Sequence, residues 1–167
     1  MLGRGIDQIL AHPGEPRLYE RHVRSATTYV ELAERKSGAI PRGVGPSYVW
    51  GDALPMLRDP ALDARIINLE TSITTSREFT PKGINYKMHP LNIGCLSAAR
   101  VDCCVLANNH VLDFGREGLA ETLRSLADAG LRTAGTVRVR RGRVTVRACD
   151  TCGTVDVGDQ PLATTRH

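Results

Sequence analysis

Apolar residues in the middle of the chain follow two different spacings. Three short apolar runs have the length and composition of buried strands, at residues 65–70, 103–107 and 131–134. Helical spacing of apolar residues predicts helices over 24–35, 48–57, 90–100 and 116–129. The last helix is the clearest, and Gly130 is placed to end it. Strands that alternate with helices in this way predict an α/β fold with a parallel sheet.

Two segments show neither strand-like nor helical spacing of apolar residues: the start of the chain and residues 71–88. Gly3 and Gly5 are typical of a loop that leaves a strand. Residues 71–88 are rich in Thr, Ser, Lys and Asn, and we interpret them as one long loop. Loops of this length are uncommon inside a compact domain and often have a function.

The spacing of apolar residues changes after residue 136. Residues 137–140 and 144–147 alternate with period two, as the strands of a hairpin do. Residues 150–167 show almost no periodicity, and we expect them to be poorly ordered. The sequence therefore predicts one domain over 1–135, followed by an Arg- and Val-rich tail over 136–167 that is disordered or arises from a frameshift.

Composition narrows the class of protein. The apolar fraction of 41% and charged fraction of 24% are typical of soluble globular domains, whereas 4% aromatic residues argue against base stacking. No apolar run approaches the roughly 18 residues of a membrane span, which makes the cytoplasm the default location. The net charge of +4 depends on an arginine cluster at 132–147, which we interpret as a solvated face, not a nucleic-acid site. Cys149 and Cys152 form a lone CxxC pair, a weak signal for zinc.

Polar side chains gather where two of the predicted strands end. Asn68 and Glu70 end the first strand, and the second leads directly into Asn109, His110 and Asp113. Ligands of open α/β sheets bind where strands end. The alternative is that Asn108 and Asn109 build a turn, that Asp113 caps the next helix, and that Glu70 is an ordinary exposed carboxylate.

The residue types at these ends suit a divalent metal. Glu70, Asn109 and His110 combine hard oxygen donors with an imidazole. A metal polarises a phosphoryl oxygen and generates hydroxide near neutral pH, and two metals clamp the attacking and leaving oxygens. Outside the metal shell, His110 is a candidate proton donor that Asp113 orients.

Four motifs in this order resemble the bacterial capsule-synthesis CapA family, named for poly-gamma-glutamate biosynthesis. They are Met1-Leu2-Gly3-Arg4-Gly5-Ile6-Asp7, Asn68-Leu69-Glu70-Thr71, Lys82-Gly83-Ile84-Asn85-Tyr86 and Leu106-Ala107-Asn108-Asn109-His110-Val111-Leu112-Asp113-Phe114-Gly115. The resemblance extends from Met1 to about Gly135.

That family is similar in fold to the calcineurin-like metallophosphatases, whose αββα core carries a binuclear centre of Mn, Fe or Zn. The resemblance implies that Asn109 and Glu70 are metal ligands and that His110 contacts phosphate or donates a proton. It also implies that Lys82, Asn85 and Tyr86 belong to a substrate-binding loop. The expected partner is the capsule or polyglutamate synthesis machinery.

Two departures from the family pattern affect the expected function. The Gly-Asp that precedes the opening loop in family members is absent, and so are the later His-containing motifs. A late start codon and a frameshift near codon 136 would explain both, and a missing start would hide a membrane anchor or secretion signal. We therefore expect the truncated N-terminal part of a metal-dependent phosphoesterase-like protein, with occupancy of the metal site in doubt. The alternative is a non-enzymatic accessory or inactive fragment of such a protein.

Overall fold

A three-stranded parallel sheet forms the centre of the molecule. The structure is a computed structural model that describes residues 1–140, 143–149 and 153–156. The sheet has the order β1-β4-β5, built from β1 (Ile66–Asn68), β4 (Cys103–Val105) and β5 (Arg132–Ala134). Both pairs are parallel, and Ile67, Cys104 and Thr133 lie side by side across them. The predicted α/β class with parallel strands is confirmed.

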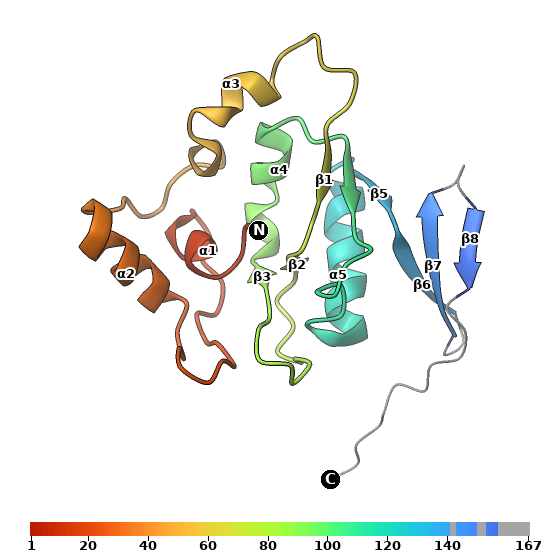
Figure 1. Ribbon diagram of the computed structural model, residues 1–167, viewed down its shortest axis with the longest axis horizontal. Coiled ribbons are helices and arrows are strands. Elements are labelled where there is room, and N and C mark those ends of the chain that lie inside the picture. The colour runs from red at the N-terminus through yellow and green to blue at the C-terminus, as the bar shows by residue number, and fades with distance from the viewer. Residues whose placement is uncertain (141–142, 150–152, 157–167) are drawn as a thin grey trace.

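Helices connect and flank this sheet, and all of them except α1 lie where the apolar spacing predicts a helix. They are α1 (Gly5–Ile9), α2 (Thr27–Ser37), α3 (Ala53–Leu57), α4 (Gly94–Ala98) and α5 (Gly115–Asp128), with 3-10 turns at Tyr48–Trp50 and Pro90–Asn92. Gly130 has φ 72° directly after α5, as expected of a helix-ending glycine. Figure 1 shows α1 and α2 on one side of the central sheet and the C-terminal strands on the other.

Two expectations about the N-terminal half are wrong. The chain does not stay in a loop at Gly5, because α1 begins there. The segment 71–88 is not one long loop, since β2 (Ser72–Ile73) and β3 (Lys87–Met88) pair in parallel near its two ends. Each of these strands is two residues long and contributes one apolar residue to the core. A strand of this length is too short to show period-two alternation in the sequence.

The C-terminal strands confirm the hairpin and correct part of the expected disorder. β6 (Thr136–Arg140) and β7 (Arg143–Cys149) form an antiparallel pair. β8 (Gly153–Asp156) adds a third strand, within the segment that we expected to be poorly ordered. The rest of that expectation, at residues 150–152 and 157–167, lies outside the described residues.

The core lies between the central sheet, the β2–β3 pair, α4 and α5. Among the described residues, the apolar ones without exposed surface are Ile73, Met88, Cys95, Leu96, Ala99, Cys104 and Leu126. Burial raises the pKa of the Cys95 and Cys104 thiols to about 11, so both stay protonated and pack as small apolar residues. β1 is at an edge of the sheet, and Ile66 exposes 65% of its surface.

Hydrogen bonds attach α5 to β2 and to the segment that follows it. The Thr122 hydroxyl accepts a hydrogen bond from Ile73 N at 2.9 Å. The carboxylate of the adjacent residue, Glu121, accepts from the Thr74 hydroxyl, from Thr75 N at 2.9 Å and from the Thr75 hydroxyl at 3.0 Å. Burial raises the pKa of Glu121, but these hydrogen bonds outweigh it and hold the pKa below its ordinary value.

Glu121→Gln should therefore reduce stability in a pH-dependent way. The ionised carboxylate stabilises the folded chain above the unfolded pKa of about 4.3, and this contribution is lost as pH falls through the lower folded pKa. Because Glu121 is partly exposed, we expect a loss of roughly 1 kcal/mol at neutral pH. Urea denaturation from neutral pH to about pH 3 measures the gap between wild type and variant.

Glu31→Gln, at an exposed position of α2, is the control and should leave the free energy of unfolding nearly unchanged. A Glu121→Gln gap that stays constant as the pH falls would contradict this account.

Candidate functional site

The turn after β4 is fixed to the end of β1 by the side chain of Asn108. Its amide group donates to the carbonyl of Leu69 at 3.0 Å and to Asn68 Oδ1 at 3.1 Å. Its Oδ1 accepts from His110 N at 3.0 Å. The carboxamide therefore joins the end of β1 to the backbone of the turn, so Asn108 holds the turn that presents the next two residues.

The two expected metal ligands, Glu70 and Asn109, have different surroundings. Glu70 is half-buried, and its Oε1 accepts from Asn68 Nδ2 at 2.7 Å. Asn109 is exposed, and the hydrogen bond assigned to it is made by its backbone carbonyl, which accepts from Lys82 Nζ. Asn108, which the alternative interpretation of the sequence assigned to the turn together with Asn109, is therefore the asparagine whose side chain organises it.

A fully buried carboxylate, Asp113, forms the centre of the site. No part of its side chain is exposed. Its Oδ2 accepts from Tyr86 N at 2.7 Å and from His110 Nδ1 at 2.9 Å, and its Oδ1 forms an ion pair with Lys82. A buried charge is tolerated only when it is paired and hydrogen-bonded, and these three partners meet that requirement.

The contact with Asp113 determines which nitrogen of His110 carries the proton. Nδ1 lies 2.9 Å from the Asp113 carboxylate and 3.2 Å from Lys82 Nζ. A carboxylate only accepts and an ammonium only donates, so Nδ1 can satisfy one of them. The carboxylate is the closer partner, and Lys82 has Asp113 Oδ1 and the Asn109 carbonyl as acceptors. Neutral His110 is therefore protonated on Nδ1, which leaves Nε2 as a proton acceptor.

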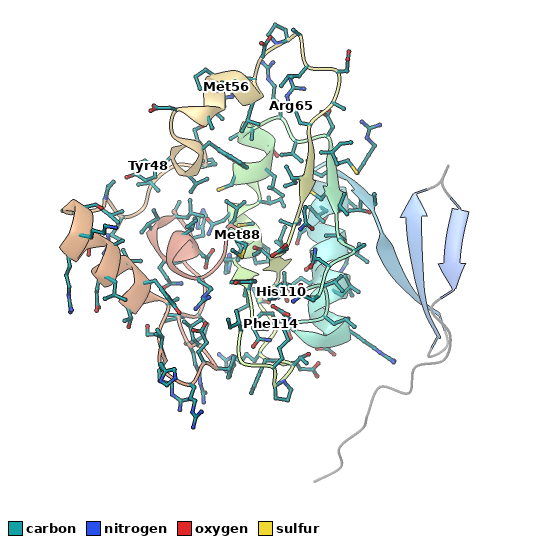
Figure 2. The ribbon with its side chains drawn as sticks, viewed as in Figure 1. Tyr48, Met56, Arg65, Met88, His110 and Phe114 are labelled. Carbon is teal, nitrogen blue, oxygen red and sulfur yellow. The ribbon has the colours of Figure 1, made fainter. Side chains whose placement is uncertain are left out.

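The three residues expected to bind substrate have different surroundings. Lys82 is engaged in the ion pair with Asp113. Asn85 is buried, and its amide donates to the carbonyls of Thr80 at 3.1 Å and Asp113 at 3.2 Å, which fastens the loop to the turn. Tyr86 places its ring against the His110 imidazole, with centroids 4.4 Å apart. Figure 2 labels His110 and Phe114 in the lower half of the view, below Met88.

Arg4 also borders the site, although the sequence did not mark it individually. Its guanidinium pairs with Glu20, contacts the Tyr29 hydroxyl and lies 5.5 Å from the Tyr86 ring centroid. Its backbone has φ 57°, a conformation that few non-glycine residues adopt. Nothing in the residue pattern reveals such a backbone angle.

The donor set does not fit a binuclear metal centre. In the part of the chain that the structure describes, no group of three or more His, Cys, Asp or Glu side chains is placed to hold a metal ion. Asp113, the carboxylate next to His110, forms an ion pair with Lys82 and has no contact with solvent. The metal implied by the resemblance stays a prediction, and the described residues alone do not supply its ligands.

Known proteins identify the family. The model of a family described as bacterial capsule synthesis protein PGA_cap matches residues 1–158. The chain belongs to this family. The motif resemblance to capsule-synthesis proteins is thereby confirmed. The PGA_cap match continues past Gly135 into the C-terminal strands.

Curated relatives of this PGA_cap chain are considerably longer than it is. The probable polyglutamine synthesis accessory protein of Mycobacterium tuberculosis, from strains CDC 1551 and H37Rv, is 53% identical over 136 residues. That alignment covers 81% of this chain and 36% of the relative. An uncharacterized protein of Sinorhizobium fredii is 34% identical over 133 residues, covering 69% of this chain and 28% of the relative. The chain thus spans about a third of the length of these relatives.

Within the described ranges, no helix of this PGA_cap chain is both long and apolar enough to cross a bilayer.

Neighbouring asparagines provide a matched test of the turn. Asn108→Ala removes the side-chain hydrogen bonds to Leu69, Asn68 and His110 and should cost about 1–3 kcal/mol in the free energy of unfolding. Asn109→Ala, one residue away and exposed, should change it by less than about 0.5 kcal/mol. Equal losses in urea denaturation of the two variants would show that Asn108 does not fix the turn.

Proposed function

We propose that this chain carries the acid–base centre of an accessory protein in capsule or polyglutamate synthesis, and that His110 exchanges a proton during hydrolysis of a phosphoester or related bond. The observation that carries the proposal is the contact between His110 Nδ1 and the buried Asp113 carboxylate. The capsule assignment draws on the PGA_cap family and on the name of the polyglutamine synthesis accessory relatives.

The chemistry of the proposal follows from the protonation state of His110. With Nδ1–H donated to Asp113, Nε2 is free of hydrogen bonds to the described residues and accepts a proton from an attacking water or hydroxyl group. The Asp113 carboxylate stabilises the imidazolium that forms, and the imidazolium then returns the proton to the leaving group. The Lys82 ammonium pairs with the other carboxylate oxygen of Asp113 and so holds the carboxylate in place beside the imidazole.

The proposed fold is the N-terminal portion of a metallophosphatase-like αββα core. Parallel strands with polar residues at the ends of β1 and β4 support this assignment. A metal bound next to His110 would polarise the phosphoryl oxygen and activate water. Glu70 and Asn109 are the residues proposed to contact it, but these two alone do not make a complete site.

A non-enzymatic accessory role is the second candidate, and the exposed edge of the central sheet favours it. Among the described residues, β1 has a neighbour on one side only, and Ile66 on that strand is largely exposed. An unpaired apolar edge is a site where another chain can add a strand. In this role, the chain would contribute a docking surface to the synthesis machinery.

Turnover of p-nitrophenyl phosphate, with and without added Mn²⁺, distinguishes the two candidates. His110→Gln keeps the approximate size of the side chain but removes the titratable nitrogen, so kcat should fall roughly 100-fold to 10,000-fold. His22→Gln, at an exposed histidine in the N-terminal segment, should retain the wild-type rate.

Unchanged turnover in His110→Gln would contradict the acid–base proposal. Absence of turnover in the wild type under every metal condition, together with folding only when a partner is present, would favour the accessory role.

A further inference from the structure

A cavity of about 350 Å³ lies between α1 and α2, next to the site but separate from its polar centre. Its walls include Ile9 from α1 and Val30 and Ala33 from α2. This volume is in the range of small-molecule pockets, which are mostly apolar with a few polar groups that orient the ligand. In Figure 1 the two helices lie side by side at the N-terminal side of the molecule.

The sequence keeps this space open between two helices that otherwise pack closely. At Gly5 the helices nearly touch, because an added Cβ would lie 3.1 Å from the Tyr29 Cβ. One helical turn further along α2, Ala33 presents only a methyl group to the cavity. A larger side chain at position 33 would fill the space, and the exposure of Ala33 means that the core does not require a small residue there.

Polar groups gather at one end of the cavity, where Arg4, Tyr29 and Tyr86 contribute to the lining. The Arg4 guanidinium lies 4.3 Å from the Tyr29 ring centroid, and its Nε is buried without a hydrogen-bond partner in the described part of the chain. An unmet donor on a buried cation costs free energy unless a ligand satisfies it. Arg4 also has its strained φ of 57°, a feature that clusters at ligand sites.

The carboxylate of Glu20 already pairs with the Arg4 guanidinium, so a ligand anion would compete with it. Glu20 also accepts a hydrogen bond from the Tyr29 hydroxyl at 2.8 Å. Burial and this hydrogen bond raise the pKa of Tyr29, so its hydroxyl remains a donor at physiological pH. A ligand oxyanion at the same end of the cavity would find two donors, Arg4 and Tyr29, that Glu20 already shows to be suited to an anion.

We infer that the cavity between α1 and α2 binds a small amphiphile, with its alkyl or aryl group against Ile9, Val30 and Ala33 and its carboxylate or phosphate head group at Arg4 and Tyr29. Tyr86 forms part of the cavity wall and also packs on His110, so the head group lies at the side of the cavity that borders the acid–base centre. The inference does not depend on chemistry at His110, because binding is measured directly.

Isothermal titration calorimetry of the purified chain with octyl phosphate, octanoate, octanol and inorganic phosphate tests the ligand class. We expect octyl phosphate or octanoate to bind at least about tenfold more tightly than octanol, since a charge-assisted hydrogen bond to Arg4 is lost in the alcohol. Shortening the alkyl chain should weaken binding about fourfold per methylene, and inorganic phosphate should bind far more weakly than octyl phosphate. Binding of neither octyl anion, equal binding of octanol, or equal binding of inorganic phosphate would overturn the inference.

Variants of the cavity locate the ligand. Ala33→Phe should weaken octyl phosphate binding by at least about tenfold, because the ring occupies the space of the alkyl group. Leu32→Phe is the matched control, on the same helix and exposed but outside the cavity, and should bind as the wild type does. Unaltered binding in Ala33→Phe would place the ligand elsewhere.

Glu20→Gln tests the head-group end without removing Arg4. If the ligand anion competes with Glu20, neutralising Glu20 should tighten octyl phosphate binding severalfold, whereas Arg4→Gln should weaken it about tenfold or more. Circular dichroism checks that each variant is folded. Weaker or unchanged binding in folded Glu20→Gln would overturn the role of Arg4 as the head-group anchor.

Discussion

The buried carboxylate of Asp113 is the constraint on which the arrangement of the site depends. A charge without exposed surface needs partners, and Asp113 takes them from separate parts of the chain: Tyr86 N, the His110 imidazole and the Lys82 ammonium. Meeting this demand brings the loop before β3 against the turn after β4. The orientation of His110 is then a consequence of the burial of its neighbour, and the same contacts place the Tyr86 ring beside the imidazole.

The parts of the molecule that could be predicted from the sequence are those set by local patterns of residues. The alternation of strands and helices over the middle of the chain is a pattern of many residues, and the sheet and α5 follow it closely. The i, i+3 pairing of His110 with Asp113 is local and was also expected. By contrast, β2 and β3 are two residues each, and their burial depends on partners far away in the chain.

Residues whose role depends on tertiary contacts could not be assigned in the same way. Asn108 and Asn109 are identical in type and adjacent, yet it is the Asn108 carboxamide that is hydrogen-bonded to the end of β1 and to the backbone of the turn. Lys82 was expected to meet substrate, but it lies in an ion pair that no spacing rule reveals. Arg4 has an unusual backbone angle and lines a cavity between α1 and α2. Neither feature can be read from the sequence, because both depend on how the chain packs.

The most direct test of the account is the protonation state of the neutral His110 ring, measured by long-range ¹H–¹⁵N NMR correlation. If Asp113 orients the imidazole, Nδ1 should carry the proton and Nε2 should be the unprotonated nitrogen. The opposite tautomer, with Nε2 protonated and Nδ1 accepting from Lys82, would contradict the central claim, because His110 would then have no basic nitrogen available for substrate.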